Sequence, residues 1–328
     1  SREEVIGIDG GGTHTRVIVA DVAGNILGYV KGNGVHPEKN KTPDLNVKHT
    51  IEAALKNANV PLESVVQIVA GFAGLNKPED KIWAQSYLEI DGLRAKKIVI
   101  NDAEIAQFGA FLGKPGVIAV SGTGSNVIGK TELGEIHSNR NFHHLPRASA
   151  RYLSYSVIYD LISQKEKKEN ESITAKILRY WNVESIEELR HLVASGFKGY
   201  ELDGIKELSD MAIIVTEEAL KGNETANRAC EKSAKSLLLG IQLVASLFEA
   251  ETVPVSLIGS VANSKPVRDI LLREMEATDS LKKLSYQEPE LSPMLGAVLY
   301  ALNEIGKEPD RSVIEKWKKE FEEQKNPC

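Results

Sequence analysis

The stretch of chain best equipped for chemistry is VIGIDGGGTHTRVIVAD, residues 5–21. Its first apolar run ends in a carboxylate, and glycines and threonines follow before a second β-branched run: Asp9, Gly10, Gly11, Gly12, Thr13 and Thr15. Glycines let backbone N–H groups converge on an anion, hydroxyls add donors, and a carboxylate at a strand end suits a hydrated divalent cation. The pattern favours a phosphate-binding hairpin with Asp9 near a metal ion; a tight hairpin that binds nothing is the alternative.

Two further turns combine glycines with hydroxyls after an apolar run. VIAVSGTGSNVIG weakly repeats the design of the first stretch and supplies four phosphate-binding candidates: Gly122, Thr123, Gly124 and Ser125. The third turn, with Gly259 and Ser260, follows the apolar run at 253–258. Two such turns facing each other across a cleft would clamp a polyphosphate, and the third would lie under a nucleoside.

A carboxylate that could act as a general base follows the expected strand at 97–100. Asn101 and Asp102 open the next helix there, and the crevice at the carboxyl ends of strands is the usual ligand site of α/β sheets. Phosphoryl transfer needs positioned phosphates, charge neutralisation by a metal, and a carboxylate that accepts the hydroxyl proton. Asp102 is the candidate base; a role as the helix N-cap is the alternative, because Asp caps helices well.

The elements that must position these residues alternate between strands and helices. We expect strands at 5–8, 16–21, 26–30, 65–70, 97–100 and 253–258, with a second hairpin around 117–129. We expect helices at 46–58, 78–88, 103–112, 224–249, 267–274, 294–305 and 312–324, and polar loops at 31–44 and 131–147. The opening βββαβαβα order indicates an α/β fold with helices on the faces of a sheet.

The composition excludes several classes of protein. The 328 residues suggest about two domains, and a net charge of −6 argues against a nucleic-acid partner. Two cysteines, Cys230 and Cys328, provide neither a disulfide framework nor a zinc or iron–sulfur site within one chain. No apolar run has membrane-spanning length and no signal-peptide pattern is present. We expect a cytoplasmic protein without a membrane partner.

Six short motifs together resemble a known family. They are DGGGTHT from Asp9, GFAG from Gly71, NDA from Asn101, SGTGSN from Ser121, GSVA from Gly259, and PMLGA from Pro293. In this order they are similar to the N-acetylglucosamine kinase and benzoyl-CoA-reductase-activase ATPase family, within the superfamily of acetate and sugar kinases, heat-shock chaperones and actin. The motifs span residues 5 to about 300, which is nearly the whole chain.

The resemblance implies two duplicated ribonuclease-H-like (actin-like ATPase) domains, 1–115 and 116–305, with an ATP cleft between them and residues from about 306 to 328 packing back on the first. It implies ATP and magnesium as cofactors and closure of the domains on a substrate. It puts Asp9 near the metal and phosphates, and Asp102 in the role of base. Thr13 and Thr123 would contact the ATP phosphates, and Gly259 and Ser260 the adenosine. Dimers are common in this family, so a homodimer is a further expectation.

Two departures from the family pattern concern the acceptor. His36 stands where sugar kinases of this family place an asparagine on the sugar, although a surface-loop role is the alternative. The family's Gly-Asp-Glu-Gly segment is replaced by residues 146–149, which loses two carboxylates and gains Arg147. Together with His143, His144 and Arg151, this arginine would suit an anionic substrate; a diverged, solvated loop is the alternative. The expected substrate-side residues are His36, Gly74, Asn101, Asp102, Asn126 and Arg147.

These residues favour an ATP- and Mg-dependent kinase that transfers the γ-phosphoryl group to a hydroxyl of an amino sugar or a related sugar. One alternative is an ATPase switch that activates a partner protein, against which the missing cluster cysteines count. The other is a diverged nucleotide-binding protein without sugar kinase activity, suggested by the lost acidic pair.

Overall fold

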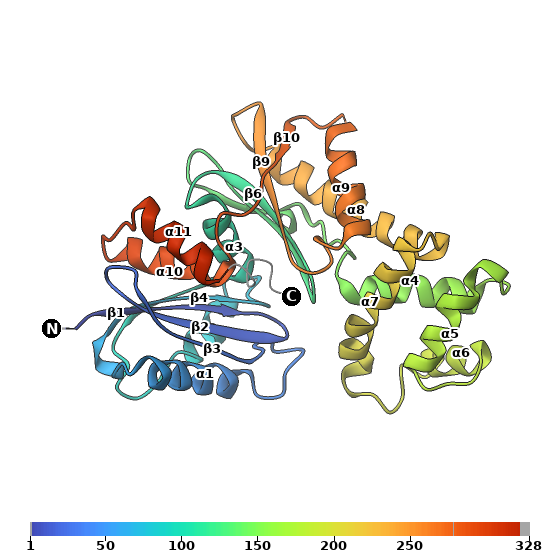
Figure 1. Ribbon diagram of the computed structural model, residues 1–328, viewed down its shortest axis with the longest axis horizontal. Coiled ribbons are helices and arrows are strands. Elements are labelled where there is room, and N and C mark those ends of the chain that lie inside the picture. Colours follow the sequence, from blue (N-terminus) through green and yellow to red (C-terminus); the bar gives the residue numbers. More distant parts are fainter. Residues whose placement is uncertain (1, 278, 322–328) are drawn as a thin grey trace.

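The computed structural model describes residues 2–277 and 279–321, and it contains two five-stranded sheets, each covered by helices (Figure 1). The first part comprises β1 (Glu4–Gly10), β2 (His14–Asp21), β3 (Ile26–Asn33), α1 (Pro43–Ala58), β4 (Val65–Phe72), α2 (Asp80–Ser86), β5 (Lys96–Asn101) and α3 (Asp102–Phe111). The expected α/β class and the opening βββαβαβα order are confirmed.

The second part begins with β6 (Gly116–Ser121), β7 (Ser125–Lys130) and β8 (Ile136–Ser138), and then becomes helical. Its helices are α4 (Ala150–Ser163), α5 (Glu171–Tyr180), α6 (Ile186–Ala194), α7 (Ile205–Leu220) and α8 (Glu224–Ala245). Then come β9 (Thr252–Ile258), α9 (Lys265–Ala277), β10 (Lys283–Tyr286), α10 (Pro293–Glu304) and α11 (Arg311–Glu320). The part of the last expected helix beyond residue 321 lies outside the described residues.

The two sheets have the same topology, which confirms the duplicated actin-like architecture. The strand orders are β3-β2-β1-β4-β5 and β10-β9-β6-β7-β8. In each sheet the first three strands form an antiparallel meander, and the two later strands run parallel to the first. The ends of β1 and β6, where the first two turns lie, therefore occupy equivalent positions in the two halves.

The sequence did not predict two strands, β8 and β10, because their hydrophobic patterns are weak. In β8 all three side chains are at least partly exposed, and the segment lies in what looked like a polar loop. In β10 a single side chain, Leu284, is buried, so four residues give no apolar alternation. Both strands lie at the edges of the second sheet. Hydrogen bonds to a single neighbouring strand, and not burial of their side chains, keep their backbone extended.

Alternate side chains of β1 pack on two different layers. Ile6 and Ile8 belong to the core under α1, whereas Val5 belongs to the core formed with α10 and α11. Gly7 allows α10 to approach the strand closely, because a Cβ there would lie 2.7 Å from the backbone nitrogen of Val298. The chain therefore returns to the first sheet at Pro293, which is earlier than the expected position near residue 306 (Figure 1).

Helix α3 lies between the two halves and fixes the position of the candidate base. One side of α3 crosses α10 at Gly109 and Gly296, where a Cβ on Gly109 would be 3.0 Å from the Cα of Gly296. The other side packs against the second sheet through a small cluster of alanines and isoleucines: Ala103, Ala106, Ala110, Ile118, Ile128 and Ile258. The first turn of α3 is consequently held at the junction of the two domains.

Candidate active site

The first two glycine and hydroxyl turns meet across a cleft between the domains. The hydroxyl oxygens of Thr13 and Thr123 are 2.9 Å apart, and a Cβ on Gly12 would lie 3.2 Å from the Thr123 methyl carbon. Both turns line the same pocket, to which they contribute Gly11, Gly12, Gly122, Thr123, Gly124 and Ser125. The structure thus brings together the two turns that the sequence analysis expected to clamp a polyphosphate.

The third turn closes the end of the second sheet beside them. Gly259 has φ +103°, and a Cβ there would lie 2.3 Å from the Ser121 carbonyl oxygen, so a larger residue is excluded. The backbone N–H groups of Val261 and Ala262 both donate to that oxygen. Gly259 lines the pocket, whereas Ser260 is exposed beside it.

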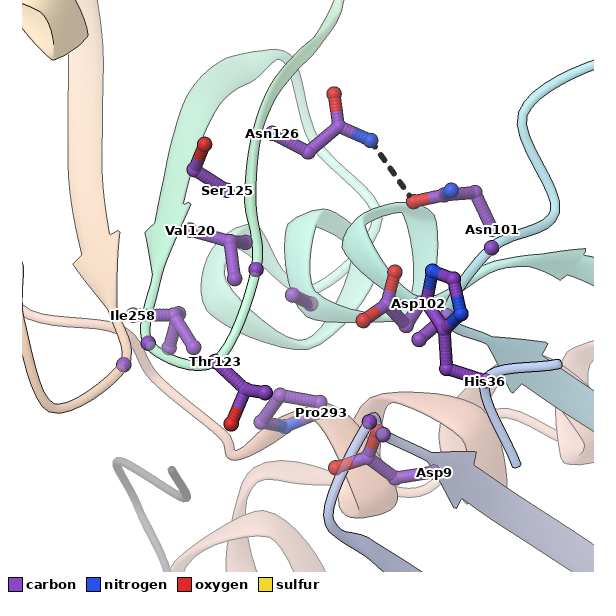
Figure 2. Close-up of a pocket in the computed structure, with 18 of the residues that line it drawn as sticks. Asp9, His36, Asn101, Asp102, Val120, Thr123, Ser125, Asn126, Ile258 and Pro293 are labelled. Carbon is purple, nitrogen blue, oxygen red and sulfur yellow. Dashed lines mark hydrogen bonds between the residues drawn. The ribbon is translucent and has the colours of Figure 1, made fainter. Parts of the chain in front are cut away.

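Apolar side chains from both domains line the pocket with these turns. They are Val120, Ile258 and Pro293 (Figure 2). They come from β6, from β9 and from the first residue of α10. An apolar surface of this kind can pack against the ring of a nucleotide.

Asp9 enters the cleft from the carboxyl end of β1 (Figure 2). Its side chain is buried, and none of the described residues donates a hydrogen bond to its carboxylate. Burial raises the pKa of Asp9 to about 7; the charge of Asp102 adds to this, and Arg16 on the adjacent strand opposes it. A buried carboxylate without donors has open coordination positions.

Asp102 is not the N-cap of α3, because Asn101 fills that role. The Asn101 side chain accepts a hydrogen bond from the backbone N–H of Ala103 at 2.8 Å, and Glu104 completes a capping box. Asp102 occupies the next position and lines the cleft (Figure 2). Burial raises the pKa of Asp102 to about 6, while the N–H of Ala103 and the charges of Lys39 and Arg140 oppose the rise. The carboxylate is mostly ionised at neutral pH and close to the pKa range of an effective base.

His36 lines the cleft, as Asp102 does (Figure 2), and is held as a neutral donor. The backbone N–H of Glu38 donates to Nδ1 at 3.1 Å, which leaves the proton on Nε2. Burial, together with the charge of Lys39, lowers the pKa of His36 to about 4. Gly74, at φ +90°, leaves space for the ring, since a Cβ there would lie 3.3 Å from Nε2. His36 therefore presents an N–H to the cleft at all pH values near neutrality.

A hydrogen bond between Asn101 and Asn126 joins the two domains in the cleft. Asn126 Nδ2 donates to Asn101 Oδ1 at 3.1 Å (Figure 2), and the Ser138 hydroxyl donates to Asn126 Oδ1. Both asparagines line the cleft, as the sequence analysis expected of them.

Three other expected residues lie elsewhere. Thr15 is buried and donates its hydroxyl to the Asn33 carbonyl at 2.6 Å within the β2–β3 pair. At Gly10 a Cβ would lie 2.5 Å from the Phe72 ring, so this glycine serves the packing of β1 on β4. Arg147 is exposed and is not among the residues that line the cleft.

Besides Arg16 on β2, two further cations that the sequence analysis did not single out line the cleft. Lys39 Nζ donates to the Thr123 carbonyl at 3.2 Å, and Lys39 Cδ would lie 3.5 Å from a Cβ on Gly12, so this lysine lies against both glycine turns. Burial and the charge of Arg151 lower the pKa of Lys39 to about 8. The second cation is Arg140, in the short 3-10 helix Asn139–Phe142. Both residues sit in lysine- and arginine-containing polar segments that looked like solvated loops, so neither spacing nor periodicity distinguished them.

The model of the BadF/BadG/BcrA/BcrD ATPase family matches residues 6–301. The chain belongs to this family. An N-acetylmuramic acid/N-acetylglucosamine kinase from Clostridium acetobutylicum is 26% identical over 79% of this chain and 86% of its own length. An N-acetyl-D-glucosamine kinase from Dictyostelium discoideum is 23% identical over 92% of this chain and 99% of its own.

Solved structures agree with the fold of this ATPase-family chain. A candidate N-acetylglucosamine kinase from Chromobacterium violaceum superposes with a TM-score of 0.71 at 19% identity, covering 90% of this chain and 98% of that one. A glucokinase from Streptomyces griseus, solved with glucose and AMPPNP, superposes with a TM-score of 0.54 at 18% identity, covering 91% and 98%. None of the described helices of our chain is long and apolar enough to cross a membrane.

Proposed function

We propose that this ATPase-family chain is a sugar kinase, which transfers the γ-phosphoryl group of ATP to a hydroxyl of an N-acetylglucosamine-like amino sugar. The observation that carries the proposal is the Asp102 carboxylate, which does not cap α3 and lines the same cleft as the two glycine turns. The names of the two curated relatives support an amino sugar as the acceptor.

The chain's own residues divide the work between the two sides of the cleft. On the nucleotide side, the glycine turns at 9–15 and 121–126, with the hydroxyls of Thr13 and Thr123, would bind phosphate oxygens. On the acceptor side, Nε2–H of His36 would donate to a sugar oxygen and orient the acceptor. Asp102 would take the proton from the attacking hydroxyl as its oxygen bonds to the γ-phosphorus and the bond from that phosphorus to the bridging oxygen of ADP breaks. Lys39, already bonded to Thr123, would neutralise charge on the transferred group.

The residues present fit a magnesium ion held mainly by water and phosphates. Among the described residues no group of three or more His, Cys, Asp and Glu side chains could hold a metal by itself. Magnesium in kinases commonly takes one or two carboxylates, several waters and the substrate phosphates, and Asp9 offers a carboxylate free of protein donors. When bound, the ion would supply charge neutralisation at the phosphates.

A coupled assay of ADP release tests the proposal. The purified protein with ATP and magnesium is screened against N-acetylglucosamine, other amino sugars, neutral hexoses and acidic sugars. We expect ADP release that depends on an amino sugar, and a decrease of about a hundredfold or more in kcat for Asp102→Asn. Sugar-independent ADP release that rises only with a partner protein, or full turnover by Asp102→Asn, would contradict the kinase mechanism.

A further inference from the structure

Arg140 lies where the cleft opens into a second cavity. This cavity, the side pocket, shares four lining residues with the cleft: Asn76, Asn101, Asn126 and Arg140. Its remaining wall includes Leu75, Lys77, Lys81 and Ile136. Because Asn101 precedes Asp102 directly, a substituent on an acceptor sugar bound at Asp102 can reach this opening.

The backbone of Arg140 is held firmly. Its N–H donates to the hydroxyl of Ser138 at 3.1 Å, and the same hydroxyl donates to Asn126. The neighbouring Asn139 is buried and accepts a hydrogen bond from the N–H of Val127 on β7. The residue that carries the guanidinium is thus tied to the second sheet and to the Asn101–Asn126 pair.

The guanidinium makes no ion pair with a carboxylate of the described residues, although the charge of Asp102 acts on it. Among the described residues, no carboxylate lies within ion-pair distance of Arg140, and its Nε is buried without a hydrogen-bond acceptor. A half-buried cation in this state is destabilising until an acceptor arrives. An anion at the opening would satisfy it.

Positive charge dominates this side of the cleft. After burial, the charges of Lys39, Arg151 and Arg140 all lower the pKa of His36, and Glu38 alone opposes them. Lys77 and Lys81 add two exposed ammonium groups at the side pocket, where Glu104 is the one carboxylate among the lining residues.

We propose that the acceptor carries an anionic substituent, a carboxylate or a phosphate, and that Arg140 binds it at the opening of the side pocket. This inference rests on the proposed sugar kinase function and names the class of acceptor. It also moves the role of anion recognition from Arg147, which is exposed outside the cleft, to Arg140. A bidentate guanidinium–anion pair supplies both affinity and orientation.

The test compares three acceptors in the ADP-release assay: neutral N-acetylglucosamine, N-acetylmuramic acid with its lactyl carboxylate, and N-acetylglucosamine 1-phosphate. For the wild type we expect kcat/KM to be higher for at least one anionic sugar than for the neutral sugar. Arg140→Gln is expected to reduce that ratio by about ten- to a hundredfold, and Arg140→Lys by less. Arg147→Gln is the matched comparison and is expected to leave the ratio unchanged. The better of the two anionic sugars identifies the substituent.

The outcomes separate this inference from the function on which it rests. If no sugar is turned over, the proposed function fails. If N-acetylglucosamine is turned over but neither anionic sugar exceeds it, the kinase stands and the inference is overturned. An equal loss of kcat/KM for all sugars in Arg140→Gln would indicate that the guanidinium binds ATP, and this would also overturn the inference. A change in the ratio of anionic to neutral sugar in Arg147→Gln but not in Arg140→Gln would overturn it as well. Added NaCl should lower kcat/KM for the anionic sugar more than for the neutral one, which checks the charge without any mutation.

Discussion

Lys39 offers the sharpest test of how the two domains act together. Its ammonium donates to Thr123 of the second domain while its own chain segment belongs to the first, and its Cδ would lie 3.5 Å from a Cβ on Gly12. Lys39→Met keeps the length of the side chain and removes the charge. A charge-assisted hydrogen bond contributes about 1.5–3 kcal/mol, which corresponds to a fall of about ten- to a hundredfold in kcat/KM for ATP.

The pH dependence gives a second, independent magnitude. Because the pKa of Lys39 is lowered to about 8, the ammonium of the free protein is about 90% charged at pH 7 and about 10% charged at pH 9. The pH profile of kcat/KM reports the free enzyme, so kcat/KM for ATP should fall about tenfold between these pH values. Lys39→Met should lack this basic limb, and Lys39→Arg should retain part of the activity while moving the limb out of range.

Lys41 provides the matched control, since it lies two residues along the same loop but is exposed and paired with Glu201 on the surface. Lys41→Met is expected to stay within about twofold of the wild type. Two results would refute the reasoning about Lys39: a Lys39→Met protein with kcat/KM for ATP within about threefold of the wild type, or one that keeps the basic limb unchanged.

Three further outcomes follow from the site and the core. Because the pKa of Asp102 is raised, its stabilising contribution is lost as the pH rises through about 6. Asp102→Asn should therefore raise the melting temperature at pH 8 and leave it unchanged near pH 3.5. A lower melting temperature of this variant at pH 8 would contradict this. His36→Leu should raise KM for the sugar by about three- to tenfold with KM for ATP unaffected, and because the pKa of His36 is about 4, wild-type KM for the sugar should show no histidine titration between pH 6 and 8. Trp317 is fully buried and donates to the Gly24 carbonyl at 2.7 Å, so Trp317→Ala should lower the free energy of unfolding by about 3–5 kcal/mol in urea titrations; an unchanged midpoint would show that α11 does not stabilise the first domain.

The backbone of the nucleotide side was predictable from sequence because its requirements are local. A glycine-rich turn after an apolar strand depends on residues within about ten positions of one another, and runs of β-branched residues indicate the strands β1 and β6. The sequence therefore predicted that Asp9, Asp102 and the turn at Thr123 belong to one cleft, which they line in the structure. Even here, the sequence could not show that Gly10 and Thr15, unlike the neighbouring residues, lie outside the cleft. Gly10 packs against Phe72 and Thr15 donates a hydrogen bond to Asn33, and both are contacts between strands.

The acceptor side was much less predictable because its residues meet through tertiary contacts alone. Arg147 and Arg140 lie seven residues apart in the same polar segment, and no local pattern says which of them faces the cleft. The choice depends on Ser138 and Asn139, whose hydrogen bonds to Asn126 and Val127 tie the short helix to the second sheet. The position of Lys39 likewise depends on a contact between the domains, its hydrogen bond to the Thr123 carbonyl.

The sequence by itself predicted an α/β fold with glycine-rich turns after apolar strands and a carboxylate at the start of α3, because apolar periodicity and glycine spacing are local consequences of backbone geometry. The ATPase family was indicated by the resemblance of its motifs. Tertiary structure decided the surroundings of these residues. The capping of α3 by Asn101 leaves the Asp102 carboxylate in the cleft, and burial between two domains shifts the pKa values of Asp102, His36 and Lys39. Desolvation and long-range charge depend on what surrounds a group in space, which no stretch of sequence contains.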